Sequence, residues 1–261
     1  MGPFEKAMRA YALLDDAALD ATWSWRGGTL QLRDALYRSL GDELDALVAA
    51  RARWERDPAT TDAERILALA DRAMGGLRGL LVGQDDALLD RVPAPGEWTL
   101  RETLRHMLDV ERRYATNTSH AVHRRDDERV SLSLDDPGMG PSDPAETSGG
   151  FERVVERLVA ARDRSDALLG ATPNAALERP SRWSQVDVTV RFRLHRFGEH
   201  IVEHTIQCEK TLEALGVRAS EARRIVRRIW SARAELEAVD ADADEIAVLD
   251  AAHDERSGVL R

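Results

Sequence analysis

The chain has 261 residues, of which 43% are hydrophobic and 32% charged, a balance typical of a soluble globular protein. Its net charge is −10 and no dense basic run occurs, which disfavours nucleic-acid binding through phosphate neutralisation. Cys208 is the only cysteine, so an intrachain disulfide is excluded and a reducing compartment fits. No apolar run approaches the roughly 20 residues of a membrane span, and no signal peptide is recognisable. We therefore expect a cytoplasmic protein without nucleic-acid or membrane partners.

Apolar residues recur at helical spacing along most of the chain, and glycine or proline separates the segments. The expected helices cover residues 3–20, 29–54, 61–90, 98–125, 151–169, 189–215, 220–239 and 243–252. Between them lie a glycine-broken turn at 23–28, a polar loop at 126–150 and an extended lead-in at 186–188. The loop is long enough to be either functional or disordered. Because every substantial segment is helical, we predict an all-α protein.

A few residues inside these helices indicate how the helices pack. Gly75, Gly76 and Gly79 each cost a helix about 1 kcal/mol relative to alanine, and we interpret them as sites of close packing. Glu111 lies near the centre of an apolar helix face, so it needs a buried partner. Cys208 projects toward a buried face and is interpreted as a core residue, not a nucleophile.

One internal echo occurs. Residues 32–43 and 100–111 share the pattern Leu-Arg-acid-x-Leu-x-x-x-Leu-x-x-Glu, with Arg38 in the position of His106. Regular leucine spacing also produces such matches by chance, so duplication and coincidence both stay open.

Two histidines four residues apart, His200 and His204, lie inside the 189–215 helix. Positions i and i+4 share one face of a helix, so both imidazoles can bind one cation at about 2.0–2.1 Å. A third ligand must come from another segment, and His106 on the flank of the 98–125 helix is the best placed. The other histidines lie on the opposite flank, beside the loop or in the tail: His195, His120, His123 and His253. The residues alone leave two interpretations open, ordinary surface histidines or a three-histidine metal site.

The two histidine segments resemble the motifs of the DinB-like (DinB/YfiT) superfamily. Residues 98–111 are similar to its pattern Trp-Ser/Thr-x-x-Glu-x-Leu-x-His-Leu-x-x-x-Glu, and residues 200–207 to His-x-x-x-His-x-x-Gln. The resemblance implies an up-down-down-up four-helix bundle with a divalent ion on three histidines, here His106, His200 and His204. It covers about residues 62–215, which divides the chain into an N-terminal helical extension, a bundle and a C-terminal helical extension, at 1–60, 61–216 and 217–261.

Characterised members of that superfamily include thiol transferases and isomerases that use mycothiol or bacillithiol. The resemblance therefore implies a metal-dependent enzyme with zinc, nickel or iron, a small-molecule substrate and a low-molecular-weight thiol cosubstrate. The metal would activate either the thiol or a water molecule. Glu203 and Asp109 are candidate catalytic groups, although a solvated helix carboxylate is the simpler interpretation of each. Gln207, Trp98 and Glu111 are candidates for residues around the metal or the pocket.

Other interpretations stay open. The metal can serve only to hold helices together in a non-catalytic binding or stress protein, in which case its removal costs stability. The segment His200–His204 also spells His-x-x-Glu-His, the string of the inverzincin peptidases. That resemblance demands a strand-rich body and a distant carboxylate ligand, which the chain lacks. A homodimer is an option that the sequence does not decide.

Overall fold

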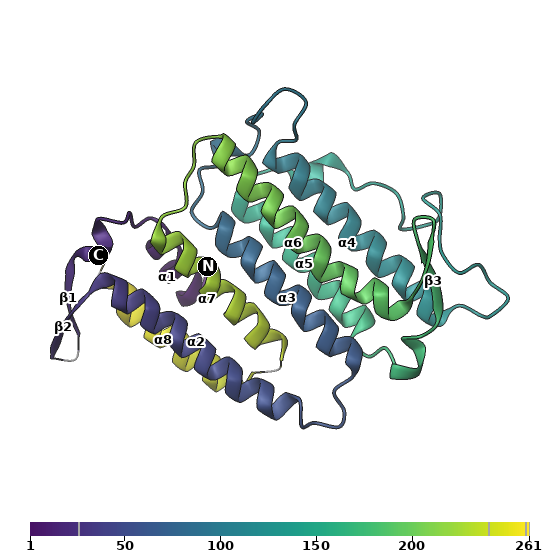
Figure 1. The fold of residues 1–261 in the computed structure, drawn as a ribbon, viewed down its shortest axis with the longest axis horizontal. Helices are drawn as coiled ribbons and strands as arrows, with labels where there is room; N and C mark the ends of the chain where they lie inside the picture. Colours follow the sequence, from purple (N-terminus) through teal and green to yellow (C-terminus); the bar gives the residue numbers. More distant parts are fainter. Residues whose placement is uncertain (26, 240, 259, 261) are drawn as a thin grey trace. The chain divides into compact units, whose positions relative to one another are not determined.

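The computed structural model describes residues 1–25, 27–239, 241–258 and 260, and this part of the chain is predominantly helical (Figure 1). The α-helices are α1 (Pro3–Ala12), α2 (Leu32–Trp54), α3 (Asp62–Leu81), α4 (Leu100–His123), α5 (Phe151–Leu169), α6 (Val190–Ala214), α7 (Glu221–Ala238) and α8 (Ala243–Gly258). Two antiparallel hairpins pair β1 (Thr22–Trp25) with β2 (Gly28–Gln31) and β3 (Pro180–Trp183) with β4 (Val186–Thr189). Short 3-10 helices are η1 (Ala18–Asp20), η2 (Asp86–Leu88), η3 (Pro144–Thr147) and η4 (Asn174–Ala176). The predicted all-α class, with helices beyond a four-helix bundle, is confirmed.

The chain forms two compact units, each with its own core. The bundle unit contains residues 58–73 and 85–215, and therefore the first part of α3 together with α4, α5 and α6. The terminal unit contains residues 1–57, 74–84 and 216–261, and therefore α1, α2, α7, α8 and the last part of α3. The sequence-based boundaries between extensions and bundle stay a prediction.

In the bundle unit, α4 contacts both α5 and α6. The ring of Tyr114 on α4 packs edge-on against Phe197 on α6, with centroids 5.6 Å apart. One turn later on α4, Thr118 accepts a hydrogen bond from Arg193, one turn earlier on α6, at 3.3 Å. Residues later in α4 thus contact residues earlier in α6, so the two helices run antiparallel.

Threonine side chains begin helices of the bundle unit. Thr99 Oγ1 accepts a hydrogen bond from the backbone N–H of Glu102 at 3.2 Å, and the Glu102 carboxylate accepts one from the Thr99 N–H at 2.8 Å. This reciprocal capping box satisfies two backbone donors that the first helical turn cannot pair. Thr61 and Thr189 occupy the corresponding positions before α3 and α6. The cap at Thr99 places His106 about two turns inside α4.

The buried carboxylate of Glu111 has the partner that its position demanded. Arg162 on α5, itself only 1% exposed, donates a hydrogen bond to it at 2.8 Å. Asp166 also pairs with this guanidinium, and Asp71 on α3 lies 3.5 Å from it. Burial, together with the charge of Asp166, raises the pKa of Asp71 to about 8, and burial also raises the pKa of Glu111. One cation therefore holds three helices together, and the cluster keeps a proton near neutral pH.

The terminal unit contains a second buried ion pair of the same kind. Glu43 on α2 is fully buried and accepts hydrogen bonds from Arg233 on α7, at 2.7 Å, and from His253 on α8, at 2.8 Å. Burial disfavours its charge, but the bonds from His253 and Arg233 outweigh burial and lower the pKa of Glu43. In the internal echo, Glu43 occupies the position of Glu111. At both positions a buried glutamate on one helix meets a buried arginine on another.

Close packing explains the glycines of α3. A Cβ atom at Gly75 would lie 2.3 Å from the carbonyl oxygen of Trp230, and one at Gly79 would lie 2.5 Å from the Cα of Arg227. Both contacts are shorter than any side chain tolerates, so α7 can approach the backbone of α3 only where glycine stands. The interpretation of these two glycines as close-packing sites is confirmed.

The structure corrects four expected elements. The 3–20 helix ends at Ala12, because Asp15 accepts a hydrogen bond from the N–H of Ala18 at 2.8 Å and begins a separate 3-10 turn. The helix expected to reach residue 90 ends at Leu81, because Gly83 adopts a left-handed φ of 66°. The expected turn at 23–28 and the lead-in at 186–188 both belong to hairpins, which were not predicted.

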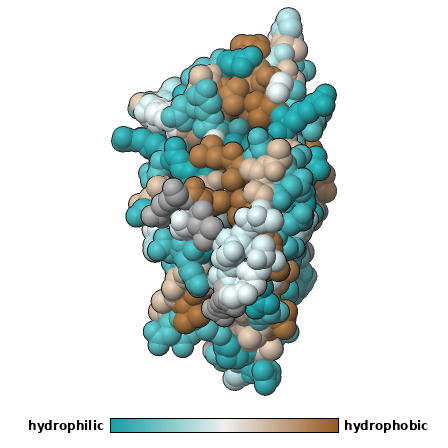
Figure 2. Space-filling view, turned by 90° about the vertical axis from the view of Figure 1, so that its left-hand side faces the viewer, coloured by the Kyte–Doolittle hydropathy of each residue, from teal (hydrophilic) through white to brown (hydrophobic). Residues whose placement is uncertain are grey.

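None of the helices in the described residues is long and apolar enough to cross a membrane. The face of the molecule seen in Figure 2 mixes hydrophilic residues with smaller hydrophobic patches.

Alanine at Gly75 should destabilise the protein, because the added methyl group collides with the backbone of α7. We expect a loss of roughly 1–3 kcal/mol in the free energy of unfolding, measured by urea denaturation. Gly41→Ala is the matched control, since nothing lies within 4 Å of a Cβ at this helical position. That variant should gain roughly 0.5–1 kcal/mol from reduced backbone entropy. Equal effects of the two substitutions would contradict the packing explanation.

Removal of the Arg162 cation should strongly destabilise the bundle unit. Arg162→Met leaves the carboxylates of Glu111, Asp71 and Asp166 without their cation, and we expect a loss of about 3–5 kcal/mol at pH 8. The loss should shrink as the pH falls, because protonated carboxyl groups no longer need a positive partner. Arg65→Met, which breaks an exposed pair, should leave the urea midpoint almost unchanged. A loss that is independent of pH would show that the shape of the side chain, not its charge, is what matters.

Candidate metal centre

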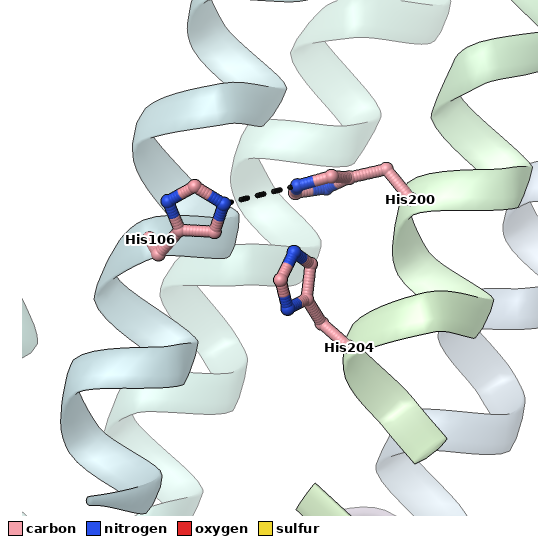
Figure 3. Close-up of side chains that lie close together, drawn as sticks. All are labelled: His106, His200 and His204. Atoms are coloured by element: carbon pink, nitrogen blue, oxygen red, sulfur yellow. Dashed lines mark hydrogen bonds between the residues drawn. The ribbon is translucent and has the colours of Figure 1, made fainter. Parts of the chain in front are cut away.

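Three imidazole rings from two helices point toward one another in the bundle unit (Figure 3). His106 projects from α4, while His200 and His204 project from successive turns of α6. The ring centroids are 4.3 Å apart for His200 and His204, 4.7 Å for His106 and His204, and 5.2 Å for His106 and His200. One ligand atom from each ring lies within 4.8 Å of the others. The cluster can therefore hold a metal ion.

The spacing of the ring nitrogens fits a small divalent ion. An ion bound tetrahedrally at 2.0–2.1 Å from each nitrogen needs those nitrogens about 3.3 Å apart. The Nε2 atoms of His106 and His200 are 3.3 Å apart. This pair therefore already has the required spacing, and a ligand atom of His204 lies within 4.8 Å of both.

Burial keeps the rings in the form that binds metals. His200 and His204 are only 7% and 8% exposed, and His106 is half-buried. Burial, with help from the neighbouring His204, His106 and Arg196, lowers the pKa of His200 to about 3. Burial and His204 likewise lower the pKa of His106. Both rings are therefore neutral near pH 7, which is the state that a metal ion requires of its imidazole ligands.

The side chain of Gln207 fixes the tautomer of one ring. Its Oε1 atom lies 2.7 Å from Nδ1 of His204, and a carbonyl oxygen can only accept, so Nδ1 carries the proton and donates. The other ring nitrogen, Nε2, is left with a free lone pair. Metal-binding histidines commonly donate their second nitrogen to an acceptor in this way. Gln207 thus holds His204 in a tautomer suited to a metal ligand.

Aromatic rings border the three histidines. Trp98, just before α4, has its ring 5.2 Å from His106 and remains 43% exposed. Tyr114, two turns beyond His106 on α4, has its ring 5.6 Å from His200. The Tyr114 hydroxyl accepts a hydrogen bond from the indole N–H of Trp183 at 3.4 Å. The half-buried His106 lies beside the exposed Trp98 and gives the cluster its access to solvent.

The candidate carboxylates lie in three different environments. Glu203 is an exposed side chain whose carboxylate is 3.8 Å from Arg196. Asp109 is half-buried one turn after His106 and accepts a hydrogen bond from the N–H of Ser142 at 2.7 Å. Glu111 belongs to the buried Arg162 cluster described above and not to the histidine cluster. Of the three, Asp109 alone combines proximity to His106 with a second oxygen left for a ligand.

A separate hollow of 470 Å³ lies on the bundle unit and is not lined by the three clustered histidines. It is lined by Ile66, Leu69, His195, Gly198, Glu199, Val202 and Glu203. His195 therefore lies apart from His200 and His204, as its helical position predicted. The lining of the hollow is mainly apolar, so the histidine cluster is the better candidate for a catalytic site.

Three residues that flank the cluster were not predicted as site residues. Arg113 follows His106 by seven residues, Arg196 precedes His200 by four, and Tyr114 follows Arg113. The helical spacing that linked His200 to His204 would have found both arginines on the flanks of the ligand faces. Arginine is so abundant in this chain that the spacing did not stand out.

The DinB superfamily pattern matches residues 69–208, which is more than half of the chain and includes all three histidines. The chain belongs to the DinB superfamily, as its two motifs predicted. No curated protein and no solved structure matches it. Family membership and the three-histidine cluster together fit a metal-binding protein.

Loss of the Gln207 acceptor should weaken metal binding without removing a ligand. In Gln207→Leu the proton of His204 is no longer held on Nδ1, so the zinc affinity should fall by roughly 10- to 100-fold. Competition with a chromophoric chelator measures this affinity. Gln185→Leu, in an exposed hairpin turn, is the matched control and should bind zinc as the wild type does. An unchanged affinity in Gln207→Leu would remove Gln207 from the site.

Proposed function

We propose that this protein is a metal-dependent enzyme that joins a low-molecular-weight thiol to a small electrophilic molecule, or transfers it between such molecules. The ion would be held by His106, His200 and His204. The observation that carries the proposal is the convergence of three imidazoles from two helices, in a chain of the DinB superfamily. Three nitrogen ligands leave a coordination position free, as in catalytic and not in structural zinc sites. Imidazole ligands suit zinc, nickel and iron.

When bound, the ion supplies a Lewis acid that lowers the pKa of a thiol or of water at its free position. The protein supplies the rest of the site. His200 and His204 are placed by consecutive turns of α6, and Gln207 sets the tautomer of His204. Trp98 lies beside His106 as a partly exposed apolar wall against which a substrate can pack. Asp109 has one oxygen held by Ser142 and can accept a proton with the other.

The proposed reaction forms a bond between the thiol sulfur and an electrophilic carbon. The S–H bond of the thiol breaks, its proton passes to Asp109 or to solvent, and the sulfur electron pair forms a bond to the electrophilic carbon. In a transfer, the leaving group departs with its bonding electron pair and takes up a proton. In an addition to a double bond, the adjacent carbon takes up that proton. Asp109 is preferred to Glu203 as the acceptor, since Glu203 is exposed and lies beside Arg196.

One observation favours a second candidate, a non-catalytic protein in which the ion only holds α4 and α6 together. His200 and His204 are less than a tenth exposed, as ligands of a structural ion would be. The half-buried His106 and the exposed Trp98 favour the catalytic alternative, because they leave one side of the cluster open. A peptidase that uses the His-x-x-Glu-His string is less well supported, since its third ligand would have to be a distant carboxylate. The cytoplasmic location, the small-molecule substrate and the homodimer option stay predictions.

The proposal predicts a bound metal that depends on the three histidines. Protein purified without a His tag should contain about one equivalent of a divalent metal by elemental analysis, as expected for one site per chain. His200→Ala/His204→Ala should contain almost none. The matched control is His195→Ala, which changes a histidine of the same helix outside the cluster. Equal metal content in all three proteins would contradict the site.

A screen of thiols against electrophiles separates the two candidate functions. The loaded protein should accelerate conjugation of mycothiol, bacillithiol or glutathione with at least one electrophile, and His200→Ala/His204→Ala should return the rate to background. A purely structural ion predicts a different result, in which no conjugation occurs and metal removal lowers the urea midpoint sharply. Hydrolysis of peptides that is lost in Glu203→Gln would instead support the peptidase.

A further inference from the structure

Two arginines flank the histidine cluster on the same side. Arg113 lies seven residues after His106 on α4, which places it on nearly the same helix face, about 10 Å further along. Arg196 lies four residues before His200 on α6, again on the ligand side of its helix. Because α4 and α6 run antiparallel, the direction toward the C-terminus of α4 is the direction toward the N-terminus of α6. Both cations therefore lie toward the β3–β4 hairpin end of the cluster.

Arg113 lacks a partner of its own. Among the described residues its half-buried side chain has no hydrogen bond or ion pair, and its Nε atom is buried without an acceptor. Side chains on a helix lean toward its N-terminus, which directs Arg113 back along α4 toward His106. A buried donor without an acceptor is costly, and an anionic ligand beside the cluster would supply that acceptor.

Arg196 is only partly paired. Its Nη1 atom donates to Glu199 at 2.7 Å, while Glu203 is at 3.8 Å and its Nε atom is buried without an acceptor. The guanidinium lies over the ring of Trp183, 4.9 Å from the centroid. Burial opposes its charge, but hydrogen bonds to Glu199 and Tyr114 more than offset it and raise the pKa of Arg196. Arg196 is thus anchored through Nη1 and retains a buried donor at Nε.

The acidic groups near the cluster do not neutralise Arg113. Asp109 accepts from the backbone of Ser142, and Glu203 lies beside Arg196. Among the described residues, neither carboxylate is within ion-pair distance of Arg113. The positive charge on this flank is therefore available to a ligand.

We propose that Arg113, supported by Arg196, is a specificity-determining residue that binds a carboxylate group on one of the two reacting molecules beside the metal centre. The inference rests on the proposed function, because it assigns the substrate class of the same site. A guanidinium presents parallel N–H donors that match the two oxygens of a carboxylate, and such charge-assisted pairs are strong in a partly buried site. The hydroxyl of Tyr114 and the ring of Trp183 complete this flank.

The same carboxylate recognition can serve the thiol or the electrophile, so the test has two arms. In the first, calorimetry compares 3-mercaptopropionate with the neutral 3-mercaptopropionamide on the zinc-loaded full chain. In the second, succinate and its neutral diamide, succinamide, are each titrated into the zinc-loaded chain already saturated with the uncharged thiol 2-mercaptoethanol. A preference for the carboxylate-bearing thiol assigns the subsite to the thiol, and succinate binding in the second arm assigns it to the electrophile.

In at least one arm we expect a carboxylate preference of about tenfold, the size typical of one charge-assisted hydrogen-bonded contact. Arg113→Gln should abolish the preference, and Arg113→Lys should keep part of it. Arg105→Gln, which removes an equal charge next to His106 in sequence, should keep all of it. Loss of preference in Arg105→Gln as well would show a general charge effect and overturn the assignment. An absence of preference in both arms would overturn it too.

Failure of the proposed function gives a different result. If the wild-type chain does not bind zinc, the function falls, and succinate is titrated into the metal-free chain to test Arg113 by itself. Binding of succinate that Arg113→Gln abolishes then still supports the anion subsite. No binding overturns it. Circular dichroism confirms that each variant is folded before the titrations are compared.

Discussion

The close approach of three imidazole rings from two helices is the constraint on which the bundle unit depends. Burial lowers the pKa of His200 to about 3, so this ring stays uncharged while a ligand atom of each ring lies within 4.8 Å of the others. The backbone must then hold α4 and α6 in one register. The Thr99 cap fixes where α4 begins, and Arg162 ties α4 to α5 through Glu111.

Much of this arrangement could be predicted from local spacing, and the remainder depended on contacts between distant segments. His200, His204 and Gln207 share one helix, so their relation follows from helical periodicity alone. The position of Glu111 on an apolar face predicted that it has a buried partner. It did not predict that the partner is Arg162, because the chain has many arginines. The two hairpins were missed since each strand has only four residues, too few for a clear alternation, and β3 begins with a proline.

The terminal segments have a compact structure of their own. They form a unit with its own core, in which Phe4, Trp23 and Trp230 are buried. Glu43 and Arg233 meet in this unit as Glu111 and Arg162 meet in the other, yet Arg38 stands at the position that corresponds to His106. If the two segments share an origin, both kept the buried ion pair, and only residues 100–111 have a histidine where the other segment has Arg38.

The ligands come from helices that are far apart in the sequence. His106 and His200 are separated by 94 positions, a stretch that includes all of α5 and the β3–β4 hairpin. An ion bound by these rings only in the folded chain would add its binding free energy to the free energy of unfolding. The supply of metal would then affect how stable the protein is, and not only the state of its histidine cluster.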